Sequence, residues 1–352
     1  MELMSREDMK KLQLAKLRKQ LIRVYEASPY YKDKFDKAKV DPYKLRSLED
    51  YRHYPFFDKE EERLSQEESR RRFRHPLGMH ITCDPEKVIR LSSTSGTTGS
   101  PTFTGYTQKD REAVNETGAR CLWRMGVRPG DVVLHAFVLS MWIAGTPVVD
   151  LLQNYGACVV PIGALSGLAR FAQIAREVFP KMLDCTPSYA EHLIDHLPAK
   201  AGIEARDLGI QKLMVAGEPG GGIPHVRERI ETGFGGATLY DTIGATGAVF
   251  LAACSSEFHE GMHFVAEDYC LFEAVDPKTL EVLPFEDGVE GEIVLTGLEK
   301  ECAPLVRWRD KDIVQVFTEP ARSGLPGFRF IIKGRADDML LVRGVNVYAH
   351  AI

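Results

Sequence analysis

The stretch Leu-Ser-Ser-Thr-Ser-Gly-Thr-Thr-Gly-Ser-Pro-Thr, at residues 91–102, decides how the rest of the chain is interpreted. An apolar run at 88–91 enters it, and a second candidate strand, 102–106, leaves it. Such a loop offers hydroxyls and backbone N–H groups to an anion, and its glycines let the backbone curve around a phosphate without a Cβ clash. It is not a GxxxxGK[ST] loop, because no Lys follows Gly99. From these residues alone, a polar hairpin turn is the alternative.

The stretch resembles the phosphate loop Ser-Gly-Thr-Thr-Gly-x-Pro-Thr of the adenylate-forming enzymes, which include acyl-CoA synthetases, luciferases and peptide-synthetase adenylation domains. The resemblance rests on Ser95, Gly96, Thr97, Thr98, Gly99, Pro101 and Thr102. Ser100 stands where the family usually has Lys. Gly-Tyr-Thr at 105–107 and Ser-Pro-Tyr-Tyr at 28–31 narrow the resemblance to the phenylacetate–coenzyme A ligase branch.

Composition indicates an ordinary globular chain with no sign of a nucleic-acid or membrane partner. The 352 residues are 44% hydrophobic and 27% charged, with a formal net charge of -5. A negative balance argues against nucleic acid and anionic membranes. No apolar run approaches the roughly 18 residues that a membrane-spanning helix needs, and the first residues lack a secretory pattern. The 7 Cys residues form no dense framework, so we expect free thiols and a cytoplasmic location.

Hydrophobic periodicity predicts helices that alternate with short strands up to about residue 250. We expect helices at 5–27, 108–127, 146–155 and 168–179, and strands at 132–137, 158–161, 182–186 and 213–216. This order argues for an α/β fold with mostly parallel sheets, whose ligands lie at the carboxyl ends of the strands. Shorter strands at 269–275, 291–295, 313–317 and 328–332 predict a small β-barrel-like part. The resulting division is a helical lead-in at 1–85, a nucleotide- and acyl-binding core at 86–250, a β-rich subdomain at 251–333 and a hinge from 334.

The resemblance implies a nucleotide site built from several separate motifs. Ala-Gly-Glu-Pro at 216–219 resembles the turn whose backbone borders the adenine. The segment 306–312 resembles Arg-Tyr-Arg-Thr-Arg-Asp, whose last residue holds the ribose hydroxyls, and a carboxylate accepts from two adjacent hydroxyls at once. Without the resemblance, Asp312 is a surface carboxylate in a charged run. The implied nucleotide ligands beyond the phosphate loop are Gly217, Glu218, Pro219, Asp241, Thr242, Thr246, Asp312 and Arg335, of which Thr246 and Arg335 join Thr98 as catalytic candidates.

The adenine segment departs from the family pattern Asp-x-Tyr-Gly-x-[Ser/Thr]-Glu at two positions. The stacking Tyr is Ile243 here, and the Glu that helps to hold Mg²⁺ is Gly247. Loss of that Glu removes one hard oxygen ligand. These changes favour a rival interpretation, a nucleotide- or acyl-CoA-binding protein that has lost adenylation.

An apolar and aromatic stretch at 137–142 predicts the acyl pocket, between it and the segment 216–245. An aromatic acid would stack on such side chains, although each of them could equally be a core residue. The expected lining residues are Phe137, Trp142, Ala216, Ile243, Gly244 and Ala245.

The last residues resemble the hinge to a mobile C-terminal domain, with Asp337 as its pivot. In the family that domain carries a catalytic Lys, and the chain ends before one could occur. Either the chain is truncated or the protein lacks this domain, and of the two we expect a truncated chain.

A group of Cys and His residues in the β-rich part is not explained by adenylation. Cys254, His259 and Cys302 are the candidate ligands of a structural zinc ion, although their spacing is looser than that of CxxC sites and buried free Cys is common. The resemblance as a whole implies an AMP-forming acid–thiol ligase that uses ATP, Mg²⁺ and coenzyme A to activate an aromatic carboxylic acid. We also consider a homodimer.

Overall fold

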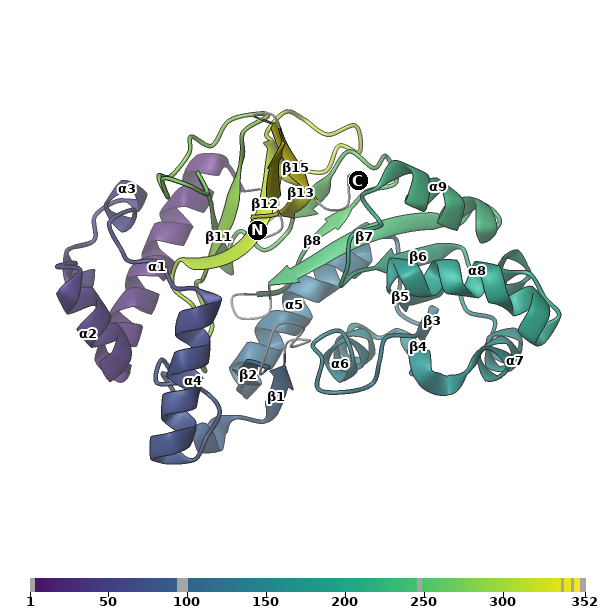
Figure 1. The fold of residues 1–352 in the computed structure, drawn as a ribbon, viewed down its shortest axis with the longest axis horizontal. Coiled ribbons are helices and arrows are strands. Elements are labelled where there is room, and N and C mark those ends of the chain that lie inside the picture. The colour runs from purple at the N-terminus through teal and green to yellow at the C-terminus, as the bar shows by residue number, and fades with distance from the viewer. Residues whose placement is uncertain (1–3, 94–100, 246–248, 337–338, 343–344, 349–352) are drawn as a thin grey trace.

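The computed structural model describes residues 4–93, 101–245, 249–336, 339–342 and 345–348. The chain begins with four helices that lie together at one end of the molecule, α1 (Arg6–Ala27), α2 (Pro29–Lys37), α3 (Leu48–Tyr51) and α4 (Lys59–Phe73) (Figure 1). Ser28 ends α1 and begins α2, because its N–H donates to the Val24 carbonyl while its hydroxyl accepts from the Tyr31 N–H.

A short hairpin follows and carries the Ser/Thr/Gly stretch between its strands. The 3-10 turn η2 (Pro85–Lys87) leads into β1 (Arg90–Ser93), which pairs antiparallel with β2 (Phe103–Tyr106). Thr107 then starts α5 (Gln108–Arg124) with a capping box, in which the Thr107 hydroxyl accepts from the Asp110 N–H and the Asp110 carboxylate accepts from the Thr107 N–H. Strand β2 of the hairpin is therefore joined to the long helix α5 by the single residue Thr107.

The middle of the chain builds a parallel sheet with helices on both faces. Its strands lie in the order β4-β3-β5-β6-β7. The elements in chain order are β3 (Val132–His135), α6 (Thr146–Tyr155), β4 (Cys158–Val160), α7 (Leu168–Val178), β5 (Met182–Cys185), α8 (Pro187–Ala201), β6 (Lys212–Val215), α9 (Pro224–Gly233) and β7 (Thr238–Ala245).

Alternate residues of these strands face two separate apolar cores. On one face Leu134, Leu183 and Leu213 pack with α7, α8 and α9. On the other face Val133 and Met182 pack with α5 and α6. Because successive side chains of a strand point to opposite faces, each nearly continuous apolar strand packs against both helical layers.

The antiparallel part continues the same sheet, so that the eleven strands run as β10-β11-β12-β13-β9-β8-β7-β6-β5-β3-β4. The change of direction falls between β7 and β8. The later strands are β8 (Val249–Ser255), β9 (Met262–Phe264), β10 (Cys270–Val275), β11 (Glu290–Gly297), β12 (Trp308–Phe317) and β13 (Arg329–Arg335), followed by a separate hairpin of β14 (Met339–Val342) and β15 (Val345–Tyr348).

The expected α/β fold class is confirmed, including the parallel core and the β-rich part that follows it. The expected helix 146–155 has the same bounds as α6, which ends at Gly156 with φ of 95°, a left-handed conformation that suits glycine. Strand β8 was absent from the expectation, because its short alternation is interrupted by small residues. Among the described helices, none combines the length and the apolar character that a membrane span requires.

Candidate functional site

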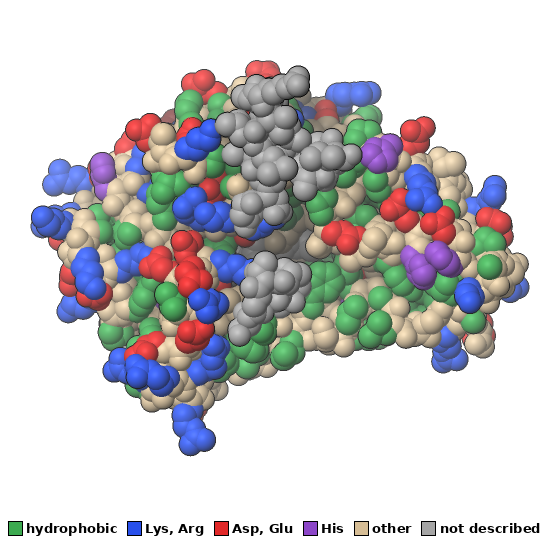
Figure 2. Space-filling view, in the orientation of Figure 1, with side chains coloured by type: hydrophobic (Ala, Val, Ile, Leu, Met, Phe, Trp, Pro, Cys, Tyr) green, Lys and Arg blue, Asp and Glu red, His purple; other side chains and the backbone are tan. Residues whose placement is uncertain are grey.

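Three segments that carry predicted site residues lie at the carboxyl ends of the parallel strands. Residues 136–145 follow β3, residues 216–223 follow β6, and β7 extends to Ala245 at the same edge. The face drawn in Figure 2 is hollowed near its centre, and acidic and basic side chains are mixed over the surface around the hollow. Three segments far apart in the sequence therefore meet at one edge.

The loop after β3 is tied to the hairpin that carries the Ser/Thr/Gly stretch. The Ser93 N–H donates to the Met141 carbonyl at 2.8 Å, and Ser93 forms a parallel bridge with Trp142. Arg90 on β1 and Arg111 on α5 both pair with Asp150 of α6, with N–O distances of 2.9 and 2.6 Å. Strand β1 is thus held against the parallel core at both of its ends.

Trp142 lies directly against Gly217 of the Gly-Glu-Pro turn. A Cβ atom at Gly217 would lie 2.8 Å from both Cη2 and Cζ2 of the Trp142 indole. Phe137, which is 2% exposed, meets the same indole edge-on at a centroid distance of 5.4 Å. The two aromatic residues predicted for the acyl pocket are therefore neighbours, and one of them, Trp142, also contacts the turn.

The turn after β6 is fixed by its own side chains. The Ser188 N–H at the start of α8 donates to Oε1 of Glu218 at 2.7 Å. A Cβ at Gly221 would lie 2.7 Å from the carboxyl of Asp241, so this carboxyl is covered by the turn, and its burial raises the pKa of Asp241 to about 7. The Thr242 hydroxyl donates to the Val215 carbonyl at 2.9 Å, which occupies the side chain inside the sheet.

Asp312 and Arg335 face each other across β12 and β13. They are direct partners in the register of the two strands, and Nη1 of Arg335 lies 3.0 Å from Oδ1 of Asp312. The same guanidinium donates to the Asp310 carbonyl at 3.3 Å. The structure thus brings together the predicted ribose ligand and the predicted nucleotide cation, which lie in different motifs of the sequence.

A family model described as AMP-binding enzyme matches residues 14–299. The chain belongs to this family. It is 33% identical over 352 residues to a phenylacetate-coenzyme A ligase of Thermus thermophilus, covering 99% of this chain and 75% of that protein. A phenylacetate-coenzyme A ligase of Escherichia coli is 32% identical over 349 residues, covering 99% of this chain and 76% of that protein.

Solved structures agree with the family assignment. A 2-hydroxyisobutyryl-CoA ligase in complex with 2-HIB-AMP and CoA superposes with a TM-score of 0.89 at 30% identity, covering 99% of this chain and 80% of that one. ATP-bound MatB from Rhodopseudomonas palustris, at 15% identity and a TM-score of 0.57, shares the fold. The expected phenylacetate–CoA ligase branch and an AMP-forming acid–thiol ligase are both confirmed at the level of the family.

Several predicted positions of this AMP-binding enzyme lie outside the described residues. They are the phosphate-loop residues Ser95, Gly96, Thr97, Thr98 and Gly99, the adenine-segment residues Thr246 and Gly247, the hinge residue Asp337, and the side chain of Ala245. Among the described positions, Gly244 is exposed and Ile243 packs against the aromatic core of the β-rich part. The roles predicted for all of these residues stay predictions.

The three predicted zinc ligands do not come together. Cys254 packs in the core below the parallel sheet, Cys302 packs with Leu77 and Ala303, and Nε2 of His259 lies 3.1 Å from Glu231. Within the described ranges, no group of three or more His, Cys, Asp or Glu side chains is arranged to hold a metal ion. The zinc site expected from sequence therefore finds no support.

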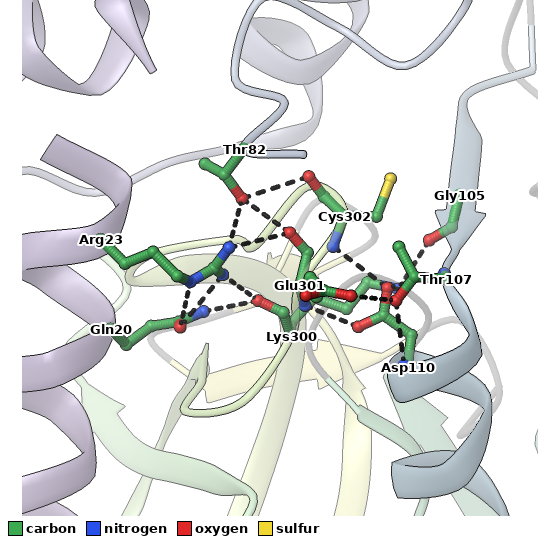
Figure 3. A network of polar contacts seen from close by, with 9 residues as sticks. All are labelled: Gln20, Arg23, Thr82, Gly105, Thr107, Asp110, Lys300, Glu301 and Cys302. Atoms are coloured by element: carbon green, nitrogen blue, oxygen red, sulfur yellow. Dashed lines mark hydrogen bonds and ion pairs between the residues drawn. The ribbon is translucent and has the colours of Figure 1, made fainter. Parts of the chain in front are cut away.

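A network that the sequence did not indicate fastens the hairpin to the loop before β12 (Figure 3). The Asp110 carboxylate accepts from the backbone N–H groups of Glu301 and Cys302, at 2.6 and 3.0 Å, in addition to capping α5. Nζ of Lys300 donates to the Gly105 carbonyl at 2.7 Å and lies 3.5 Å from Asp110. Because Gly105 belongs to β2, these contacts connect the strand that leaves the Ser/Thr/Gly stretch to the loop that leads towards Asp312. We call Thr107, Asp110, Lys300 and Glu301 the hairpin clamp.

Two further buried polar groups flank the site. Glu62 on α4 hydrogen-bonds the Thr102 hydroxyl, and burial raises the pKa of Glu62 to about 7. Nδ1 of His135 lies 2.9 Å from Oδ2 of Asp184 at the ends of β3 and β5, where both side chains are fully buried and burial raises the pKa of Asp184. The only sequence signal for this pair was a charged residue inside an apolar strand.

Proposed function

We propose that this protein joins a carboxylic acid to ATP with release of pyrophosphate and then transfers the acyl group to the thiol of coenzyme A. The observation that carries the proposal is the contact of Trp142 with both Ser93 and Gly217. Through this one residue, the strand that enters the Ser/Thr/Gly stretch, the aromatic loop and the Gly-Glu-Pro turn adjoin one another. A carboxylate and a nucleotide bound to these segments would be neighbours, as in-line attack on the α-phosphate requires.

Asp312 and Arg335 suit the nucleotide. The Asp312 carboxylate has two acceptor oxygens, and Arg335 holds one of them at 3.0 Å. A carboxylate oriented in this way can accept from both ribose hydroxyls, and an Arg side chain that is 42% exposed can also reach a phosphate. Mg²⁺ would neutralise charge on the phosphates, as in other phosphate-activating sites.

The acid is proposed to be aromatic, an aryl or arylacetic acid. Phe137 meets Trp142 edge-on, and the partly exposed Trp142 indole can pack against an aromatic ring. The phenylacetate-coenzyme A ligases named above are in keeping with this choice. Trp142 also occupies the space beside Gly217, so the pocket should favour a small ring over an extended chain.

The test is pyrophosphate release with a panel of acids, followed by detection of the CoA thioester by mass spectrometry. The panel contains benzoic, phenylacetic, 2-hydroxyisobutyric and long-chain fatty acids. We expect release with the first two and thioester only when coenzyme A is added. Preference for the hydroxy acid would overturn the aromatic assignment. Nucleotide binding by calorimetry without pyrophosphate release from any acid would favour the rival interpretation, a homologue that has lost adenylation.

A further inference from the structure

Two cysteines meet beside the hairpin clamp. Cys83 lies just before η2, and Cys302 lies in the loop between β11 and β12. The Cys83 side chain packs against the apolar cluster that Cys302 forms with Leu77 and Ala303. Neither residue is in a disulfide in this structure.

The backbone holds the two thiols in this arrangement. The Thr82 N–H donates to the Cys302 carbonyl at 2.8 Å, and the Thr82 hydroxyl donates to the Glu301 carbonyl at 2.7 Å. Thr82 also accepts from Arg23 of α1, which itself donates to the carbonyl groups of Lys300 and Glu301 (Figure 3). Cys83 therefore sits next to a segment that is fixed to Cys302 from two sides.

The two thiols differ in access and in chemistry. Cys302 is fully buried, with Leu77 and Ala303, whereas Cys83 is half-buried at the edge of the same cluster. The neighbouring Cys302 thiol lowers the pKa of Cys83, with Arg23 acting in the same direction, whereas the Cys83 thiol and burial raise the pKa of Cys302. A half-buried thiol beside a fully buried second thiol is the arrangement of an attacking and a resolving cysteine.

We propose that Cys83 and Cys302 are a redox-active pair that a hydroperoxide oxidises to a disulfide. The Cys83 thiolate attacks one peroxide oxygen, the O–O bond breaks, and the other oxygen leaves as an alcohol or water, which gives a sulfenic acid at Cys83. The Cys302 thiol then attacks the Cys83 sulfur, the S–O bond breaks, water leaves, and the S–S bond forms. The two electrons that reduce the peroxide come from the two thiols, and an external thiol reverses the reaction.

Formation of the bond would act on the hairpin. In a disulfide the two sulfurs must come to about 2.05 Å of each other. Asp110 holds the Cys302 N–H at 3.0 Å, and the Cys302 sulfur packs against Gly105 on β2. After Cys83 the chain continues through η2 into β1, which enters the Ser/Thr/Gly stretch. The disulfide is therefore expected to displace β1 and to weaken ATP use.

The first experiment detects the bond itself and does not depend on activity. The experiment uses a Cys158→Ser background, because the exposed Cys158 thiol could form disulfides between molecules. Protein treated with hydrogen peroxide is alkylated, digested without reductant and examined by mass spectrometry. We expect a peptide pair joined through Cys83 and Cys302, which is lost after thiol treatment and never forms in Cys83→Ser. Oxidation of Cys83 to sulfinic or sulfonic acid without the joined pair would overturn the proposal.

The second experiment measures ATP-dependent pyrophosphate release by the oxidised and the reduced protein, and this arm rests on the proposed function. We expect a several-fold lower kcat/KM for ATP in the oxidised form, restoration by dithiothreitol, and no peroxide sensitivity in Cys83→Ser. Equal rates before and after quantitative disulfide formation would overturn the effect on the hairpin. An inactive reduced protein would refute the proposed function, and ATP affinity by calorimetry would then report on the hairpin instead.

Discussion

Replacement of Asp110 by Asn should destabilise the protein strongly, because this one carboxylate serves four partners. It accepts from the N–H groups of Thr107, Glu301 and Cys302 and faces the ammonium of Lys300 at 3.5 Å. Asp110 is 2% exposed and Lys300 is 8% exposed, so water cannot replace the lost contacts. Asn keeps the shape but removes the charge and turns one acceptor into a donor.

The expected cost follows from these contacts. Leaving a buried N–H without an acceptor costs about 1–3 kcal/mol, and removing one partner of a buried ion pair costs about 3–5 kcal/mol. Lys300 retains its hydrogen bond to Gly105 at 2.7 Å and lies 3.8 Å from the centre of the Tyr106 ring, which softens the second cost. Since contacts within one network are not additive, we expect a total loss of about 3–5 kcal/mol in the free energy of unfolding.

The measurement is urea unfolding followed by tryptophan fluorescence, with Asp33→Asn as the matched control. Asp33 pairs with Lys37 at 2.7 Å on α2, but the two side chains are 62% and 76% exposed. Exposed pairs of this kind contribute little, so the control should unfold like the parent protein. Breaking a buried ion pair costs about 3–5 kcal/mol. If Asp110→Asn lowers the free energy of unfolding by less than about 1 kcal/mol, the role assigned to the hairpin clamp is refuted.

Three other outcomes are expected. Burial holds the pKa of Glu62 at about 7 against 4.5 in the unfolded chain, so the free energy of unfolding should fall as pH rises between these values. The melting temperature of Glu62→Gln should depend less on pH across this range than that of the parent protein. An equal pH dependence would contradict the burial argument. Asp312→Asn should weaken ATP binding about 10- to 100-fold by calorimetry, as for the loss of hydrogen bonds to a charged group, whereas Glu290→Gln on neighbouring β11 should not. Gly217→Ala, at φ of 91° and 2.8 Å from the indole, should lower acid activation, and Trp142→Phe should recover part of that loss; no recovery would refute the contact.

Local signals in the sequence were enough to locate the elements that bear the motifs. Helix α6 begins next to Pro147 and ends at Gly156, and the residues between them have helical periodicity. The Gly-Glu-Pro turn was recognised as the end of a strand because an apolar run, Leu213 to Val215, leads directly into it. Both predictions rest on residues that are close together in the sequence, so they do not depend on how distant segments pack.

Contacts between distant segments could not be predicted in the same way. Asp110 and Lys300 are ordinary charged residues in the sequence, and only the fold makes them partners. The zinc expectation failed for a related reason, since sequence spacing does not tell which face of a strand a residue occupies. On β8, Ala253 faces the aromatic core of the β-rich part while Cys254 faces the core shared with α5. Alternation along a single strand thus separates residues that are adjacent in sequence.

The helices at the start of the chain pack against the β-rich part of the molecule. Their apolar core is completed by Leu271, Leu298 and Val306 from the β-rich part, so they have no separate core of their own. The Tyr31 hydroxyl donates to the Pro304 carbonyl at 2.6 Å, and the Arg307 guanidinium, which pairs with Glu273, donates to the Arg52 and Tyr54 carbonyls.

These contacts fix both ends of one short segment. Residues 300–302 are held by Arg23 and by the hairpin clamp, and residues 304–307 are held by α2 and the chain after α3. The segment continues directly into β12, which carries Asp312. The N-terminal helices therefore set the distance between the strand that leaves the predicted phosphate loop and the strand that bears the proposed ribose ligand, although no residue of α1 or α2 is assigned to the site. A change at Arg23 should accordingly alter nucleotide affinity through position alone, without touching the nucleotide.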